Sequence, residues 1–200
     1  MSSQPPILIH GAGGHAKVAY SVAISLGREV IGFLAPSSDL QSLFNLPIFR
    51  ADPFRSEAEQ FVAVGNNGTR KAIADSLRGP IATLIHPSAM IANDVTIGQG
   101  TLVCAGAIIQ TCTSIGQNTI INTKASVDHD CRIGNFVHIA PGATLCGNIT
   151  VGDQALIGAG ATVIPNLEIN SGATLAAGAL AIEEIPRNET WVGVPAKYKP

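Results

Sequence analysis

From residue 85 to residue 180 the sequence repeats with a period of six residues. Sixteen consecutive hexads each begin with Ile, Val or Leu, and no residue is inserted or lost between them. The fifth position of a hexad is nearly always small or β-branched, as at Ala89, Val95 and Thr101. An unbroken period of six predicts a parallel β-helix in which three hexads close one triangular coil and the first-position aliphatics stack inward in a continuous core.

Composition narrows the class of protein. The chain has 200 residues and a formal net charge of −2, which leaves no basic footprint for nucleic acid. It contains no run of 18 apolar residues, so we expect no membrane span. Residues 1–10 lack a charged segment followed by a small-residue cleavage site. We therefore expect a cytoplasmic protein.

The four cysteines do not form a zinc or disulfide pattern. Residues 18 apart stack on adjacent coils, yet none of Cys104, Cys112, Cys131 and Cys146 is 18 from another. No CxxC pair occurs either. We expect buried or corner thiols in a reducing compartment.

The region before the hexads begins with a strand, a glycine turn, a helix and a second strand. These elements are expected at residues 7–9, 10–17, 18–26 and 30–34. This order is the first half of a nucleotide-binding βαβ unit. The N-terminal region is therefore expected to be a Rossmann-like α/β domain.

The glycines of the turn suggest a phosphate site. Gly11, Gly13 and Ala16 fit the spacing G-x-G-x-x-G/A, in which backbone amides and the helix N-terminus receive a phosphate group. The acid expected after the second strand of a dinucleotide site is missing, because Leu34 is followed by Ala35 and Pro36. The region before Ile85 is also too short for two mononucleotide halves, so both features argue against a dinucleotide. A tight turn without a ligand is the alternative explanation of the glycines.

The rest of this region reads as short elements. We expect a loop over residues 37–58 with one strand at 46–49, a strand at 61–64, a helix at 69–77 and a last strand at 81–85.

The first turn of the helix at 69–77 contains Arg70 and Lys71, whose charge opposes the helix dipole. Either a nearby anionic ligand or simple exposure to solvent would explain them.

Five segments together resemble the bacterial sugar acyltransferases of the left-handed β-helix superfamily. They are GAGGHAK (11–17), VGNNGTRKAI (64–73), SVDHDC (126–131), IGNFVHIAPGA (133–143) and WVGVPAK (191–197). The resemblance spans essentially the whole chain. It is greatest to N-acetyltransferases that act on nucleotide-linked 4-amino-4-deoxy sugars in the bacillosamine and perosamine pathways. Sialic acid O-acetyltransferases share this architecture.

The resemblance implies features that the period of six does not. These are a left-handed solenoid, a homotrimer and acetyl-CoA bound between neighbouring β-helices, with no metal. It implies a nucleotide-sugar-binding Rossmann-like domain at 1–84, a β-helix acyltransferase domain at 85–182 and a tail near CoA at 183–200.

His129 is the candidate general base, because acetyl transfer to an amine requires removal of a proton. It occupies the third position of its hexad, at a corner, between Asp128 and Asp130. A flanking carboxylate would fix the tautomer and stabilise the imidazolium. The resemblance assigns this role to Asp130, where relatives often have Glu. A surface histidine among acids is the alternative.

Coil geometry relates two further residues to His129. Gly147 lies 18 residues later and should stack directly over it, leaving space for a pantetheine arm near an amide that could reach the thioester. A corner glycine with positive φ is the simpler explanation. His138 lies nine residues away, half a coil, and should sit on the opposite side of the prism. A site that uses both histidines would combine two chains.

The resemblance supplies the remaining candidates. It places Asn122 near the amino group of the sugar, His138 at the acetyl-CoA site of a neighbouring subunit, and Lys197 near a CoA phosphate. The nucleotide diphosphate would contact residues of the two N-terminal turns, namely Gly11, Gly13, Gly14, His15, Asn66 and Asn67. Relatives often have acids near the uridine at the position of Leu34-Ala35-Pro36, so the identity of the nucleotide stays open.

Three alternatives accompany the N-acetyltransferase hypothesis. The nearest is O-acetylation of a sialic-acid-like sugar. A metal-dependent lyase like the β-helix carbonic anhydrases is remote, because His86 lies more than two coils below His129, roughly 11 Å along the axis. A nucleotide-sensing module with a decayed solenoid conflicts with the intact His129-Asp130 pair.

Overall fold

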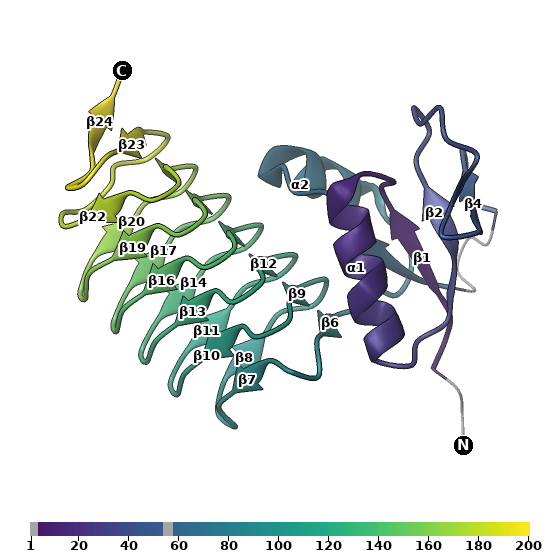
Figure 1. Cartoon of the computed structure of the whole chain (residues 1–200), viewed down its shortest axis with the longest axis horizontal. Coiled ribbons are helices and arrows are strands. Elements are labelled where there is room, and N and C mark those ends of the chain that lie inside the picture. The colour runs from purple at the N-terminus through teal and green to yellow at the C-terminus, as the bar shows by residue number, and fades with distance from the viewer. Residues whose placement is uncertain (1–3, 54–57) are drawn as a thin grey trace.

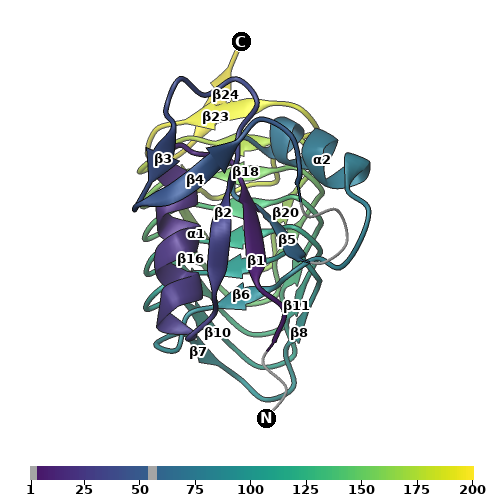
Figure 2. The ribbon, with the colours of Figure 1, turned by 90° about the vertical axis from the view of Figure 1, so that its right-hand side faces the viewer.

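The computed structural model describes residues 4–53 and 58–200. Residues 1–3 of the N-terminal region, and residues 54–57 of the loop expected at 37–58, lie outside the described parts. The chain forms a small α/β domain and a three-sided parallel β-helix that lie side by side (Figures 1 and 2). The α/β domain rests against one side of the β-helix, near the coils that come first in the sequence (Figure 1).

The α/β domain has one five-stranded sheet in the order β3-β4-β2-β1-β5. Its strands are β1 (Ile7–His10), β2 (Val30–Leu34), β3 (Ser42–Leu43), β4 (Leu46–Phe49) and β5 (Glu59–Val62), and its helices are α1 (Gly14–Ser25) and α2 (Asn67–Ser76). All pairs are parallel except β3–β4. The predicted strand, turn, helix and strand at the N-terminus are confirmed.

Several bounds in this domain differ from the sequence predictions. The helix α1 begins at Gly14 and not at residue 18, and β5 spans Glu59–Val62 in place of 61–64. The strand β3 was not expected; Phe44 and Asn45 have φ of 52° and 61°, as in the tight hairpin turns that twist with their strands. The helix α2 begins two residues before 69 because the side chain of Asn66 caps it, accepting a hydrogen bond of 2.9 Å from the amide of Thr69.

The predicted strand at 81–85 is not a single strand of this domain. Ile81 makes only an isolated bridge with Gln60, which extends the α/β sheet by one residue. Leu84 and Ile85 form β6, which pairs with Leu102 and Val103 of β9 in the β-helix. The solenoid therefore begins at Leu84, and the chain passes from one domain to the other without a linker.

The β-helix consists of three parallel sheets. The first, here the β6 sheet, contains β6 (Leu84–Ile85), β9 (Leu102–Val103), β12 (Ile120–Ile121), β15 (His138–Ile139), β18 (Leu156–Ile157), β21 (Thr174–Leu175), β23 (Thr190–Val192) and the antiparallel β24 (Lys197–Lys199). The second contains β7 (Met90–Ile91), β10 (Ile108–Ile109), β13 (Ser126–Val127), β16 (Thr144–Leu145), β19 (Thr162–Val163) and β22 (Leu180–Ala181). The third contains β8 (Thr96–Ile97), β11 (Ser114–Ile115), β14 (Arg132–Ile133), β17 (Thr150–Val151) and β20 (Glu168–Ile169).

The register of the sheets confirms the repeat. Each residue pairs with the one 18 positions later, as Ile121 does with Ile139. First-position aliphatics from Val103 onward are buried, and the three earlier ones, Ile85, Ile91 and Ile97, pack partly buried against the same core. The fourth position of the hexads turns the corners in the left-handed conformation, with φ of 56° at Lys124 and 60° at Asp130. The architecture is the three-sided parallel β-helix that the period of six predicts.

Arg70 joins the two domains. Its side chain is 1% exposed, and its five N–H groups donate to backbone oxygens of both domains and to Asn67 Oδ1. The oxygens on the β-helix are those of Asn118, Phe136 and Val137, at 2.7–3.1 Å, and those on the α/β domain are Val64 and Gly65, at 2.9 and 3.2 Å.

For Arg70 this arrangement differs from both explanations offered for the basic first turn of α2, whereas the Lys71 side chain is partly exposed to solvent, as the second explanation expects. The Arg70 guanidinium donates to carbonyls of its own chain, and burial lowers its pKa to about 10. Lys71 pairs with Asp75 at 2.6 Å, one helical turn later, and lies over the ring of Phe136.

The four cysteines are free thiols, as expected. Cys104 and Cys131 are buried, Cys146 is half-buried, and Cys112 is exposed at a corner. Neither helix in the described residues is long and apolar enough to cross a membrane.

Candidate active site

A cleft of about 580 Å³ opens at the end of β1 that leads into α1. Gly13 caps α1 without a side-chain hydrogen bond, so the first amides of the helix are available to a ligand. Added Cβ atoms at Gly13 and Gly14 would meet nothing within 4 Å, whereas one at Gly11 would lie 2.8 Å from the carbonyl oxygen of Ala63. The lining includes residues 11–15, 34–38 and 63–65, with Thr69 and Ile73. Four of the predicted nucleotide contacts, Gly11, Gly13, Gly14 and His15, thus lie together.

Asn66 and Asn67 are not among the residues that line this cleft. The Asn66 side chain caps α2. The Asn67 amide donates to the carbonyls of Gln154 and Ala155, both at 2.9 Å, and its oxygen accepts from Arg70. Both side chains are engaged in holding α2, and Asn67 ties this helix to the β-helix.

The far edge of the cleft consists of uncharged residues, from Leu34 to Ser38. Arg50 braces this edge by donating to the carbonyls of Pro36 and Ser38, at 3.0 and 3.1 Å. The missing acid noted in the sequence is therefore not replaced by another acidic side chain in the cleft lining.

Beyond His15 the cleft approaches a cluster on the β6 sheet. The rings of His15 and His138 are 6.1 Å apart, and Asn122 Nδ2 lies 3.0 Å from His138 Nε2. The Asn122 oxygen accepts from the amide of Thr123 at 2.8 Å, which orients the amide so that Nδ2 donates to the histidine. His138 also hydrogen-bonds to the backbone of Gly65. This cluster, the half-buried His15 and His138 with the buried Asn122, is called the buried cluster below.

The histidines of the buried cluster are uncharged near neutral pH. Burial lowers the pKa of His138 to about 4, and the positive charge of Arg70 acts in the same direction. Burial also lowers the pKa of His15 to about 4, followed by the effects of His138 and Arg70. The Nε2 atom of His15 is buried without a hydrogen-bond partner among the described residues. A ligand atom at the inner end of the cleft would supply the missing hydrogen-bond partner of His15 Nε2.

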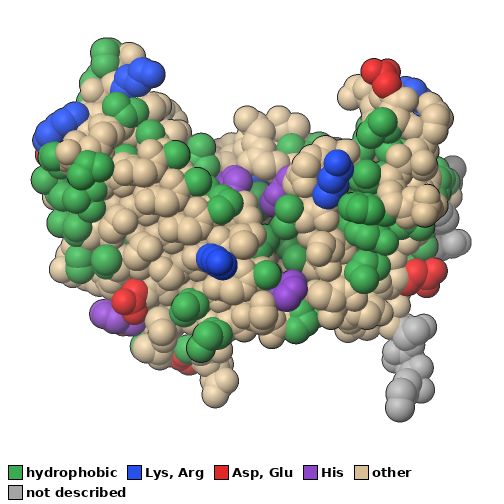
Figure 3. Space-filling view, in the orientation of Figure 1, with side chains coloured by type: hydrophobic (Ala, Val, Ile, Leu, Met, Phe, Trp, Pro, Cys, Tyr) green, Lys and Arg blue, Asp and Glu red, His purple; other side chains and the backbone are tan. Residues whose placement is uncertain are grey.

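His129 lies at the corner between β13 and β14 in the opposite environment. Its side chain is about half exposed, and Nδ1 contacts Asp130 Oδ2 at 2.7 Å. The hydrogen bond to Asp130 raises the pKa of His129, and the charge of Asp128 contributes in the same direction. The predicted pairing of His129 with Asp130 is thus present, and the left-handed backbone of Asp130 turns its short side chain toward the ring. Figure 3 shows histidine side chains both where the domains meet and beside acidic atoms at the edge of the β-helix.

Gly147 stacks over His129 as predicted, but for a different reason from either one suggested. It is not among the glycines with positive φ. The space above it is not open, because an added Cβ would lie 2.4 Å from His129 Cε1 and 2.6 Å from Nε2. The missing side chain makes room for the imidazole itself, which lies directly against the backbone of the next coil.

The His129 corner and the buried cluster lie on opposite sides of one chain. His129 is at the corner between the second and third sheets, whereas His138 belongs to β15 of the β6 sheet. In a triangular coil this corner faces away from the β6 sheet. Asn122, predicted to lie near the amino group of the sugar, contacts His138 and so lies on the side of the β-helix away from His129. A single chain therefore cannot bring the predicted site together.

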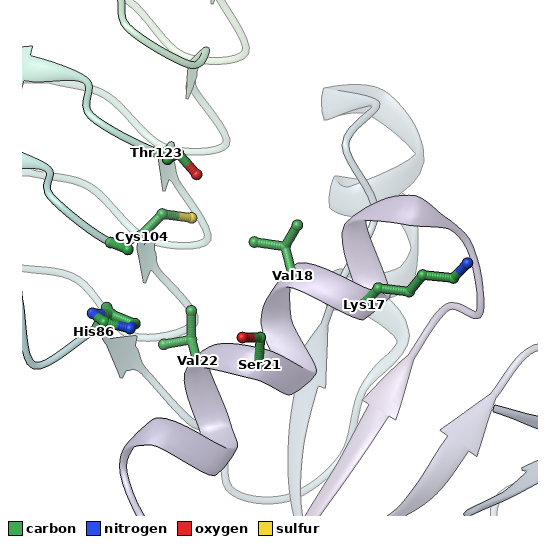
Figure 4. Close-up of a pocket in the computed structure, with 8 residues that line it drawn as sticks. Lys17, Val18, Ser21, Val22, His86, Cys104 and Thr123 are labelled. Carbon is green, nitrogen blue, oxygen red and sulfur yellow. The ribbon is translucent and has the colours of Figure 1, made fainter. Parts of the chain in front are cut away.

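A second pocket, of about 280 Å³, lies between α1 and the β-helix. Lys17, Ser21 and Val22 line it from the helix, and His86, Cys104 and Thr123 from the corners of successive coils (Figure 4). Thr123 follows Asn122 directly, so this pocket adjoins the buried cluster.

At the C-terminus, Lys197 is exposed and pairs with Glu183 at 2.6 Å. A CoA phosphate would have to compete with this carboxylate. Within residues 4–53 and 58–200, no three of His, Cys, Asp and Glu come together in a group that could hold a metal ion.

Comparison with known proteins gives two family matches. The PglD N-terminal domain matches residues 6–77, and the bacterial transferase hexapeptide family, as six repeats, matches residues 112–147. A UDP-N-acetylbacillosamine N-acetyltransferase of Bacillus subtilis (strain 168) is 46% identical over 43 residues, which is 20% of this chain and 20% of that protein. The chain thus matches only about a fifth of the length of the Bacillus protein.

Solved structures match over the whole chain. The acetyltransferase domain of PglB from Neisseria gonorrhoeae FA1090 is 36% identical with a TM-score of 0.91, over 98% of this chain and 100% of that one. A histidine-to-asparagine mutant of perosamine N-acetyltransferase from Caulobacter crescentus, in complex with CoA and GDP-perosamine, is 33% identical with a TM-score of 0.93, over 98% and 97% of the two chains. WeeI from Acinetobacter baumannii AYE is 26% identical with a TM-score of 0.88, over 97% and 99%. The chain belongs to the hexapeptide-repeat sugar N-acetyltransferase family, of the perosamine and bacillosamine type, that carries a PglD N-terminal domain.

Proposed function

We propose that this protein transfers the acetyl group of acetyl-CoA to the amino group of a nucleotide-linked 4-amino-4-deoxy sugar. The observation that carries the proposal is the His129–Asp130 pair, an accessible imidazole whose Nδ1 is held by a carboxylate at 2.7 Å. Nδ1 is engaged, so Nε2 is left to accept a proton. Relatives that bind CoA and GDP-perosamine support the choice of donor and acceptor class.

In the proposed reaction the amine nitrogen attacks the thioester carbon directly. The N–C bond forms, His129 Nε2 takes the amine proton, and the C–S bond breaks as CoA leaves as its thiolate, which regains the proton. Backbone amides, that of Gly147 among them, stabilise the oxyanion of the tetrahedral intermediate. Asp130 stabilises the imidazolium that forms on His129.

We place the substrates across two chains. The nucleotide diphosphate would lie at the amides of Gly13 and Gly14 beside His15, and the sugar amine near Asn122. His129 of a neighbouring chain would meet His138 and Asn122 of the first, since one chain cannot bring them together. A homotrimer provides three such sites, with Lys197 near the CoA phosphates if Glu183 releases it.

The decisive experiment measures thiol release from acetyl-CoA with a panel of acceptors. The panel contains UDP- and GDP-linked 4-amino sugars, free sialic acid and CMP-linked sialic acid. Release with an amino sugar, reduced about 10²–10⁴-fold by His129→Ala, is expected. Because His129 is exposed, the variant should unfold at the same temperature as the parent. Release with sialic acid alone would instead assign the protein to the sugar O-acetyltransferases. The uncharged edge of the cleft at residues 34–38 is compatible with that outcome, because it lacks the acid that relatives often have near the uridine.

Mixed oligomers test the placement across chains. His129→Ala and His138→Ala chains, each inactive alone, should together regain activity when co-assembled at random. About a quarter of the sites would then receive both intact residues. A mixture that stays inactive, or a monomer in sedimentation, would contradict the shared site.

A further inference from the structure

A buried hydroxyl lies at the base of the His129 corner. Thr113, 2% exposed, belongs to the coil below. Its Oγ1 donates to the carbonyl oxygen of Asp128 at 2.9 Å and accepts from the amide of Cys131 at 3.2 Å. These two backbone groups stand immediately before and after His129 and Asp130. One side chain thus bonds both ends of the corner.

At most other corners in the described part of the β-helix, no side chain from the coil below lies between the two backbone groups that begin and end the corner. Where the residue one coil below is Ala, the corner closes on itself, as in the bond of 3.0 Å from the Ala125 amide to the Asn122 carbonyl above Ala107. The corresponding bond from Ala143 to Ala140, above Ala125, is 3.1 Å. At the His129 corner the Thr113 hydroxyl occupies the position between the same two groups, Asp128 O and Cys131 N. The inserted hydroxyl holds this corner open.

The same column continues upward. Cys131, the next residue in the stack, donates its thiol to the carbonyl of Cys146 at 3.2 Å. That carbonyl precedes Gly147, against whose backbone the His129 ring lies. Two successive corners, one with the imidazole and one with the glycine it lies against, are therefore opened by polar side chains from below.

We propose that Thr113 is a positioning residue for His129. Its hydroxyl, inserted between Asp128 and Cys131, sets the backbone from which the imidazole reaches Asp130 and lies against Gly147. This inference rests on the proposed function, in which His129 is the base. Without the hydroxyl, the corner can close with a bond from Cys131 to Asp128, as the alanine corners do, and the ring would move relative to its partners.

Thr101 offers a matched control. It is fully buried, its Oγ1 donates to the carbonyl of Gly116 at 2.8 Å, and it accepts from the amide of Thr119 at 3.1 Å. The geometry is the same, but the corner it opens has no residue assigned to catalysis. Thr101→Val and Thr113→Val remove the same two bonds with nearly the same change in volume.

The kinetic test compares Thr113→Val, Thr113→Ser and Thr101→Val. Both Val variants should lose thermal stability, Thr101→Val at least as much as Thr113→Val, because its corner contains the Asn118 carbonyl that accepts from Arg70. Only Thr113→Val should lose kcat, about 10-fold or more, as expected when a catalytic group is misplaced. Its KM values should change less than about threefold, and Thr113→Ser, which keeps the hydroxyl, should retain the parent kcat. Equal losses of kcat in both Val variants would overturn the inference, as would an unchanged kcat in Thr113→Val.

A second measurement does not depend on activity. The pKa of the His129 imidazole can be followed by NMR, using the Cε1 proton in protein labelled at histidine. Two carboxylates act on this ring from its own corner, Asp130 and Asp128, while the corners below and above contribute the Cys112 thiol and the uncharged Asn148. Thr113→Val should move the pKa down toward 6.5 because the contact with Asp130 is disturbed, and Thr101→Val should not.

The two measurements separate this inference from the proposed function. Full activity in His129→Ala would disprove the assignment of the base, yet the NMR titration would still report whether Thr113 positions the ring. A pKa that is the same in the parent, Thr113→Val and Thr101→Val would disprove the role of Thr113 even if His129 proves to be the base.

Discussion

The His129 corner and the buried cluster place the same kind of side chain in opposite environments. His129 is exposed and paired with a carboxylate, which raises its pKa. His138 is half-buried, and desolvation, with the positive charge of Arg70 acting in the same direction, lowers its pKa to about 4. An imidazole that gains a proton readily suits a base, whereas one that stays neutral suits a fixed hydrogen-bond partner.

The difference extends to how each histidine is held. His138 is fixed by Asn122 and by the backbone of Gly65 in the other domain, so its position depends on the contact between the two domains. His129 is fixed within the β-helix, by Asp130, the backbone at Gly147 and the base of its own corner. We therefore expect changes at the buried cluster to reduce both stability and activity, and changes at the corner to reduce only the rate of acetyl transfer.

The largest expected effect follows replacement of Arg70, which supports the buried cluster. Arg70→Met would leave several buried carbonyls of both domains without a donor, at about 1–3 kcal/mol each. We expect the free energy of unfolding to fall by at least about 3 kcal/mol, measured by urea denaturation. Lys71→Met, which removes the adjacent exposed cation, should change it by about 0.5 kcal/mol or less. Similar effects of the two variants would show that Arg70 does not join the domains.

Gly147→Ala should affect the rate without affecting stability. The new methyl group would lie 2.4 Å from His129 Cε1, so the exposed ring must swing away, while the backbone can stay in place. We expect kcat to fall about 10-fold, as for other displacements of a catalytic group. A double-mutant cycle provides the control: in the His129→Ala background the same change should have no further effect. A full loss in that background would mean that Gly147 acts on the acetyl donor and not through the histidine.

The smallest effect concerns the pH dependence of the rate. A base works in its deprotonated form, so kcat/KM should rise with pH and level off above the raised pKa of His129. Asp130→Asn removes the main cause of the raised pKa, so the rising limb should move to lower pH. The plateau should fall several-fold because the imidazolium loses its carboxylate partner.

Asp128→Asn removes the weaker cause and should move the same limb less. A profile measured from pH 5 to 9 distinguishes the two variants. Unchanged limbs in both would show that the ionisation seen in the rate is not that of His129.

Much of the β-helix could be predicted because its contacts are local and repeated. Residues 18 apart become neighbours, so the stacking of Gly147 over His129 and the separation of His129 from His138 follow from counting positions. The glycine turn before α1 was equally accessible, because its backbone requirements are set within a few residues.

Other parts of the site could not be predicted because they depend on contacts across the chain. Arg70 and Asn67 looked like ligand-facing residues of a helix N-terminus, yet both bind backbone oxygens of the β-helix more than 40 positions away. Thr113 was one of many fifth-position residues, and only its two hydrogen bonds distinguish it from the alanines. Gly147 makes room for the His129 ring, and this role could be recognised only once the direction of the His129 side chain was known.

The sequence by itself determined the period, the coil, the nucleotide-type turn and the pairing of His129 with an adjacent acid. Each of these depends on residues that are close in the chain or separated by a fixed repeat. The tertiary structure decided which side of the β-helix the α/β domain covers, and hence which histidines lose contact with water. Because burial and neighbouring charge together set the pKa of an imidazole, only the folded chain distinguishes His129 from His15 and His138.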